Sequence, residues 1–121
     1  MASGGSFIAF LAEQLAPLGP VAPRRMFSGH GLFCHGVMFG LVVREALYLR
    51  GDAQNRPVFE AAGAAPFSYS RQGRRVELAY WRVPDHLLDE AEELLVWARS
   101  GLAAAQRVAA GKQAAPKRRA R

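Results

Sequence analysis

The hydrophobic and polar positions at the start of the chain follow the period of an α-helix. Between residues 7 and 15 the apolar side chains recur at the spacing that places them on one helix face. Ser6 stands where a hydroxyl can cap the first turn, and a proline- and glycine-rich stretch from Pro17 ends the pattern. The predicted buried stripe consists of Phe7, Phe10, Leu11 and Leu15.

From residue 24 to residue 50 the pattern changes to that of strands. Segments 24–27 and 31–34 predict one strand with a bend at Ser28-Gly29-His30. Segment 37–43 holds no polar residue, which predicts a strand covered on both faces, and segment 46–50 predicts its return strand. His35-Gly36 and Arg44-Glu45 are short breaks, and tight turns join only antiparallel neighbours.

The second half of the chain is predicted to form a short helix, two strands and a last helix. A short helix is predicted to begin near Asp52 or Asn55 and to end at Gly63. Alternation then predicts strands over 67–71 and 75–83, joined by a turn at Gln72-Gly73-Arg74, with Tyr69 and Tyr80 on core-facing sides. A last helix runs to about residue 110, and its predicted buried stripe is Ala91, Leu94, Leu95, Ala98, Leu102 and Ala105.

The predicted order of elements is therefore α-β-β-β-α-β-β-α. Strands and helices do not alternate as parallel βαβ units require. We predict an α+β domain with an antiparallel five-stranded sheet on which the helices pack.

Charge divides the chain into two parts. The net charge of the 121 residues is +6, but residues 1–110 hold 11 basic and 10 acidic residues and are almost neutral. Residues 111–121 hold no acid and five bases, which are Lys112, Lys117, Arg118, Arg119 and Arg121. We expect one domain over 1–110 and a disordered basic tail over 111–121.

Other features narrow the class of protein. No apolar run approaches the roughly 18–20 residues that cross a membrane, and the N-terminus lacks the basic start of a signal peptide. The single cysteine, Cys34, permits no internal disulfide, which indicates a cytoplasmic protein. Arginine outnumbers lysine 14 to 2, a bias that a GC-rich genome explains without phosphate binding.

We weighed three kinds of catalytic or cofactor site. His30, Cys34 and His35 lack the fourth ligand of a structural metal site, and alternation points His35 away from the other two. The glycines around Gly29 precede a strand, whereas phosphate-binding loops precede a helix. A further set of acids suits the positive end of a helix dipole: Asp85, Asp89, Glu90, Glu92 and Glu93. We therefore predict no catalytic residue, metal or cofactor, and a pocket lined by His30, Cys34 and His86 would revive an enzymatic reading.

Basic residues beside aromatic ones leave nucleic-acid binding open. The predicted contacts in the body are Arg24, Arg25, Arg71, Arg74 and Arg75, near Tyr69, Tyr80 and Trp81. Arginines and aromatic rings on a sheet can bind single strands, and the five bases of the tail can add attraction that is blind to sequence. The neutral body lacks the charge excess typical of such proteins.

The run Met-Phe-x-Gly-x-Gly-Leu-Phe at 26–33, followed by Gly-Val-Met-Phe at 36–39, resembles the N-terminal domain of the TfoX/Sxy family. The similarity continues through Leu47-Tyr48-Leu49, Asn55 and Phe59 and covers roughly residues 7–105. Further matching positions are Arg25, Leu41, Gly63, Phe67, Tyr69, Tyr80, Pro84 and the helix from Leu94 to Ala98.

The resemblance implies an α-β(3)-α-β(2)-α domain and a link to regulation. TfoX/Sxy proteins are bacterial regulators of competence for DNA uptake, acting with the cyclic-AMP receptor protein, and the resemblance carries no catalytic residue or cofactor. This chain has Cys34-His35 where relatives often have a base and an acid, and Arg50 where a lysine is common. Only the basic tail stands where full-length members have a C-terminal helical domain.

Together these features predict a small regulatory module that works by protein–protein contact, with transcription machinery as the expected partner. Direct nucleic-acid binding through the hairpin arginines and the tail is the alternative. Self-association as a two-fold dimer is one way to cover an exposed sheet edge or face.

Overall fold

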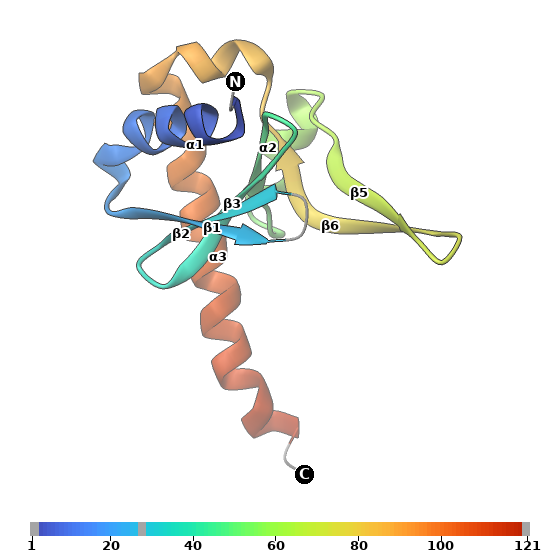
Figure 1. Cartoon of the computed structure of the whole chain (residues 1–121). Helices are drawn as coiled ribbons and strands as arrows, with labels where there is room; N and C mark the ends of the chain where they lie inside the picture. The colour runs from blue at the N-terminus through green and yellow to red at the C-terminus, as the bar shows by residue number, and fades with distance from the viewer. Residues whose placement is uncertain (1–2, 27–28, 120–121) are drawn as a thin grey trace.

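The computed structural model describes the backbone of residues 3–26 and 29–119 and the side chains of residues 6–26 and 29–111. These residues form an α+β domain with an antiparallel sheet, which confirms the predicted class (Figure 1). The helices are α1 (Ser3–Gln14), α2 (Arg56–Ala61) and α3 (Ala91–Arg119), with 3₁₀ turns η1 (Ala16–Leu18) and η2 (Asp85–Asp89). The strands are β1 (Val21–Met26), β2 (Gly29–Cys34), β3 (Val37–Val43), β4 (Ala46–Arg50), β5 (Pro66–Arg71) and β6 (Arg74–Arg82).

The strands make one sheet in the order β1-β2-β3-β4-β6-β5, with every neighbouring pair antiparallel. Three two-residue turns join its hairpins at 35–36, 44–45 and 72–73, and both residues of each turn have positive φ. That backbone matches the right-handed twist of the flanking strands, which is why tight hairpins use it. The three predicted turns are confirmed, with Arg74 already inside β6.

The sheet has six strands where the sequence predicted five. The predicted bent strand is a hairpin, because β1 and β2 pair antiparallel with Met26 opposite Gly29. A glycine-containing polar break serves a bend or a reversal equally well, so the local pattern could not distinguish them. β1 also begins earlier than predicted, at Val21, and includes Pro23. An edge strand accepts proline because one side of it makes no ladder hydrogen bonds.

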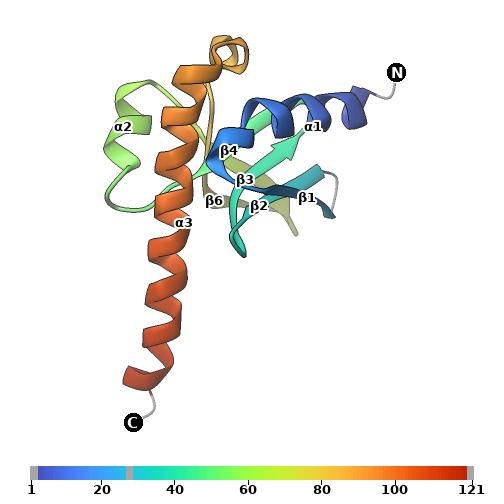
Figure 2. The ribbon, with the colours of Figure 1, turned by 90° about the vertical axis from the view of Figure 1, so that its left-hand side faces the viewer.

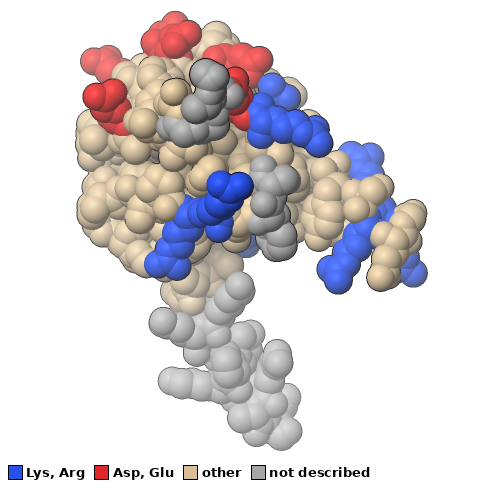
Figure 3. Space-filling view, in the orientation of Figure 1, with Lys and Arg blue, Asp and Glu red and all other residues tan. Residues whose placement is uncertain are grey.

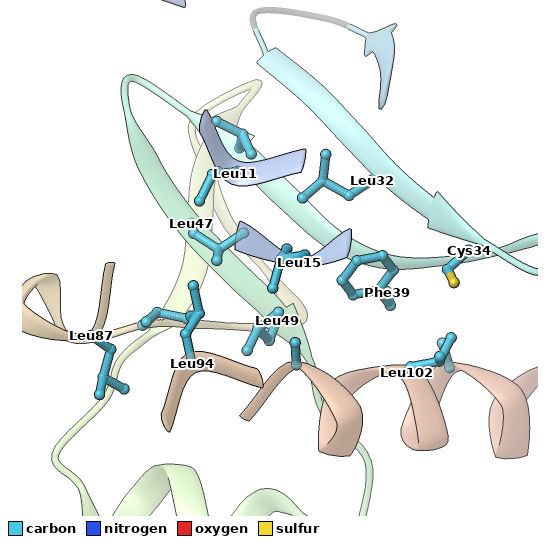
Figure 4. Close-up of a cluster of buried hydrophobic side chains, with 14 of the residues drawn as sticks. Leu11, Leu15, Leu32, Cys34, Phe39, Leu47, Leu49, Leu87, Leu94 and Leu102 are labelled. Carbon is cyan, nitrogen blue, oxygen red and sulfur yellow. The ribbon is translucent and has the colours of Figure 1, made fainter. Parts of the chain in front are cut away.

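The helices cover one face of the sheet. Leu11 of α1, Leu15 directly after it, and Leu94 and Ala98 of α3 have no exposed surface, which confirms most of the predicted helix stripes. Figure 4 shows these helices directing leucines toward leucines of the central strands and Phe39. Each such buried leucine contributes about 1.5–3 kcal/mol. Ser6 lies inside α1, so the predicted helix cap is wrong.

A hydrogen-bonded network ties the loop before α2 to α3. The carboxylate of Asp52 accepts two hydrogen bonds from the Arg107 guanidinium, at 2.6 and 2.9 Å. The buried amide of Asn55 donates to the carbonyl oxygen of Arg50 and to the Ser100 carbonyl and hydroxyl oxygens. These bonds hold β4, α2 and α3 together at one corner of the domain.

Helix α3 runs along the sheet and extends beyond it (Figures 1 and 2). Its bounds include residues 111–119 of the predicted tail, but the side chains from residue 112 onward lie outside the described part of the structure. The predicted disorder of that tail therefore stays a prediction. Among the residues described, no helix is both long enough and apolar enough to cross a bilayer.

The second face of the sheet also carries apolar side chains. Phe39 to Val42 are all buried, so the predicted cover on both sides of β3 is confirmed there. Tyr69, however, is 39% exposed, and Leu78 is 37% exposed. The assignment of Tyr69 to the helix-covered core is therefore wrong: alternation fixed which residues share a face, but not which face the helices would cover.

Candidate functional site

A groove of about 550 Å³ lies on the face of the sheet opposite the helix-packed core. Residues from both edge strands, β1 and β5, line this groove. In a flat sheet these strands would be five inter-strand steps, or roughly 24 Å, apart. The sheet must therefore curl, and the breaks in register near Phe39 and Phe67 supply the bends. We call this site the concave groove; it is lined by Met26, Gly29, Met38, Leu41, Val43, Phe67, Tyr69, Arg71 and Leu78.

A glycine makes room for the methionines of the groove floor. A Cβ on Gly31 would lie 2.6 Å from the sulfur of Met38 and 2.7 Å from the sulfur of Met26. Any larger residue here would force the two thioethers to move from their positions across β2. Methionine side chains are flexible and polarizable, so this floor can adapt its shape to an apolar partner.

Aromatic rings form the wall of the groove on the β5 side. The rings of Phe67 and Tyr48 form a T-shaped pair with centroids 5.1 Å apart. The centroid of the Tyr69 ring lies 6.2 Å from that of Phe67. Edge-on contact fixes Phe67 by packing against β4. Tyr69 and Leu78 stay accessible and complete the apolar lining.

Tyr80 holds the backbone of Met38 in position through a hydrogen bond. Its hydroxyl donates a hydrogen bond of 3.1 Å to the Met38 carbonyl oxygen. Burial raises the pKa of Tyr80, while the nearby Arg50 guanidinium, 5.4 Å from the ring centroid, opposes that rise. Tyr80 thus stays neutral and acts as a structural donor; it is buried, as predicted, but on the concave side of the sheet and outside the helix-packed core.

The structure divides the predicted arginines between the two faces of the sheet. Arg24 pairs directly with Gly31, so both lie on the concave side, and its guanidinium stands 4.7 Å over the Phe33 ring. Arg71 lines the groove and pairs with Arg74, which places Arg74 on the same side. By alternation Arg25 and Arg75 point to the opposite side.

The acidic residues lie elsewhere. Within the six described strands the sole acid is Glu77, which pairs with Ser68 on the other face and lies 3.6 Å from Arg75. In Figure 3 the red groups lie at the top of the view, around η2 and the start of α3, with one blue group beside them, whereas other blue groups lie over β1 and near the tip of the β5–β6 hairpin. Arg24, Arg71 and Arg74 therefore lie on the concave side of the sheet, and the described strands bring no acidic side chain to that side.

For His30, Cys34 and His35 the sequence predicts no metal site. His30 and Cys34 lie on β2, and His35 lies in the turn that follows it. No group of three His, Cys, Asp or Glu suited to a metal occurs in the described part of the chain. Cys34 is buried, and this burial raises the pKa of its thiol, which disfavours the reactive thiolate.

The predicted contacts of the tail lie outside the described side chains: Lys112, Lys117, Arg118, Arg119 and Arg121.

The apolar lining of the groove was missed by sequence reasoning. The available signal was β3, whose two apolar faces both need cover, although the apolar stripes of the helices serve only one face.

Comparison with known proteins supports one family. A model of the TfoX N-terminal domain matches residues 13–105, which include every residue of the concave groove. No curated protein matches the sequence significantly.

Proposed function

The chain belongs to the TfoX N-terminal domain family, and from this premise we propose that it is a small regulatory module that acts by binding another protein in the concave groove. The observation that carries the proposal is the apolar lining of that groove on the face that the helices leave uncovered. Contiguous apolar surface that a single chain leaves open is typical of interaction sites.

The proposal assigns the domain no catalytic step. Catalysis needs an acid, a base or a nucleophile that converge on one reacting atom. The groove offers apolar side chains, one tyrosine and one arginine, which suit recognition. The role in transcription or competence is the finer part of the proposal and rests on family membership.

Photocrosslinking in cells tests the contact. A photoreactive phenylalanine analogue replaces Tyr69 or Leu78 in the groove, and Val96 serves as the control because it is 63% exposed and lies on α3. We expect both groove positions to capture one shared protein that Val96 does not capture. Identical products from all three positions, or no product from the groove, would refute the proposal.

Transcript profiling tests the regulatory part. A strain that carries Leu78→Asp should reproduce the transcript changes of a deletion strain, because the charge blocks the groove without entering the core. Val96→Asp should behave as wild type. If Leu78→Asp leaves transcripts unchanged while the crosslinks are lost, the contact does not serve transcription.

Direct nucleic-acid binding remains the second candidate, favoured by Arg71 and Arg74 on the same face as Phe67 and Tyr69, and by Arg24 over the Phe33 ring on the other side of the groove. Binding to labelled DNA at two salt concentrations tests it, since phosphate contacts weaken steeply with salt. The body is the binding surface only if a chain truncated after Ala110 still binds. Loss of all binding on truncation assigns the attraction to the tail.

A further inference from the structure

The charges around the concave groove constrain what can occupy it. Arg71 lines the groove, Arg74 is its cross-strand partner on the same face, and Arg24 lies on the opposite side over Phe33. The described strands bring no acid to this face, since Glu77 lies on the other. A partner that enters the groove therefore meets a positive rim and gains by carrying negative charge.

The floor of the groove constrains the partner's backbone. Methionine, leucine, valine and phenylalanine side chains offer no hydrogen-bond partner to a peptide group. An extended segment laid on this floor would bury unsatisfied N–H and C=O groups, each at a cost of free energy. A helix satisfies its own backbone and presents only side chains, which is the usual solution for apolar grooves.

A nucleic acid fits the floor less well. Bases stack on flat, open aromatic faces, but Phe67 is packed against Tyr48 in a T-shaped pair, Tyr69 is the single exposed ring of the lining, and the floor is aliphatic or thioether. The Phe33 ring already has the Arg24 guanidinium over it. The positive rim alone would attract any anion, so the apolar floor is what favours a protein helix over a nucleic acid.

From these three constraints we propose that the concave groove binds an amphipathic helix of a partner protein, with apolar side chains on the floor and acidic side chains paired with Arg24, Arg71 and Arg74. This inference rests on the proposed function and adds the chemistry of the partner.

A designed peptide pair tests the inference on the full chain. The probe is a fluorescein-labelled helix of about 16 residues, long enough to fold on binding, with leucines at i, i+3, i+4 and i+7 and glutamates on the flanks. The matched peptide has glutamine in place of every glutamate. Fluorescence anisotropy gives Kd at about 50 and about 300 mM NaCl, a range over which exposed charges become screened.

Variants of exposed residues locate the binding site without disturbing the core. Leu78→Asp should raise the Kd of the acidic peptide about tenfold or more, because it places a charge on the apolar floor. Arg71→Gln should raise it about two- to fivefold and reduce its salt dependence. Val96→Asp and Arg99→Gln on α3 are the matched controls and should leave Kd unchanged. Far-UV circular dichroism and thermal unfolding establish that each variant is folded.

The inference is supported if the glutamate peptide binds more tightly than the glutamine peptide and the difference shrinks with salt. Equal binding of the two peptides overturns it, while the proposed function still stands if the crosslinks at Tyr69 are found. A labelled single-stranded oligonucleotide that binds more tightly and responds to Arg71→Gln, but not to Leu78→Asp, also overturns it. So does a dimer that Leu78→Asp dissociates and that the acidic peptide cannot displace, since the occupant is then a second copy.

Discussion

The side chain of Asp52 links local and distant structure. Its carboxylate accepts hydrogen bonds from the backbone N–H groups of Gln54 and Asn55 and from the guanidinium of Arg107, 55 residues away. The hydrogen bonds from Arg107 lower the pKa of Asp52 from its ordinary 3.8 to about 2, although partial burial opposes the shift, and Asp52 in turn raises the pKa of Arg107. A single residue thus holds the α2 loop against α3.

Replacing Asp52 should make stability less dependent on pH. The folded chain keeps this carboxylate ionised to about pH 2, while the unfolded chain protonates it near 3.8. The ion pair therefore stabilises the fold fully above about pH 5, and that contribution is lost progressively as pH falls to and below the folded pKa of about 2. Asp52→Asn should lower the free energy of unfolding by about 1–2 kcal/mol at pH 7, and the difference from wild type should shrink to less than about 0.5 kcal/mol at pH 2.

Urea unfolding at about pH 7, 4 and 2 measures this difference. The control is Glu60→Gln, which breaks the exposed pair with Arg56 and should cost less than about 0.5 kcal/mol. A difference for Asp52→Asn that stays constant over this range would show that charge is not its source.

The β3–β4 turn carries backbone strain. Arg44 and Glu45 have φ of 51° and 62°, a region that costs residues with a Cβ roughly 1 kcal/mol each. Glu45→Gly should therefore raise the free energy of unfolding by about 0.5–1 kcal/mol. The reverse change in the equivalent turn, Gly73→Ala at φ 78°, should lower it similarly, because open space around Gly73 leaves only the backbone effect. Thermal unfolding of both variants checks the pair, and a loss of stability for Glu45→Gly would contradict it.

At the scale of elements, α3 divides its residues between core and solvent. Leu94 is fully buried against the core cluster, while Val96, two positions along, is 63% exposed. The 3.6-residue period of the helix causes this difference. Sequence periodicity predicted the buried side, because the stripe of one helix depends only on its own spacing.

Replacing Leu94 or Val96 with alanine should lower the free energy of unfolding by unequal amounts. Leu94→Ala should lower the free energy of unfolding by about 2–4 kcal/mol, because it leaves a cavity between α3 and the sheet. Val96→Ala should change it by less than about 0.5 kcal/mol. Denaturant titration of both variants measures the two losses in free energy of unfolding. Similar losses would mean that α3 does not pack as described.

At the scale of the whole molecule, one core joins both halves of the chain. The cluster includes Leu11 from α1, Leu32 and Leu47 from the sheet, and Leu102 from α3. The indole rings of Trp81 and Trp97 both pack against Phe59, with centroids 5.8 and 5.6 Å apart, so tryptophan fluorescence reports on the corner formed by α2, α3 and β6.

Unfolding should accordingly be a single cooperative transition. Tryptophan fluorescence and far-UV circular dichroism should give the same midpoint in urea, because no part of the core is separate from the rest. An earlier midpoint by fluorescence would mean that the α2–α3 corner unfolds apart from the sheet.

The fold was predictable to the extent that it depends on local pattern. Helix stripes such as Leu11 and Leu15, the alternation in β6 and the turns at 35–36 and 72–73 each follow from neighbouring residues. The β1–β2 reversal was missed because glycine permits a bend and a hairpin alike. The groove was missed because Met26, Leu41 and Tyr69 come from three separate segments that meet only when the sheet curls.

By itself the sequence determined the α+β class, the order of most elements, the family resemblance and the near-neutral sum of charge in the body. These depend on residue type and on spacing along the chain. Tertiary structure alone decided which sheet face the helices cover, how the register breaks bend the sheet into a groove, and that Arg24 and Arg71 lie on its two sides. The physical reason is that a strand's alternation is local, whereas the burial of either face depends on every layer that the rest of the chain supplies.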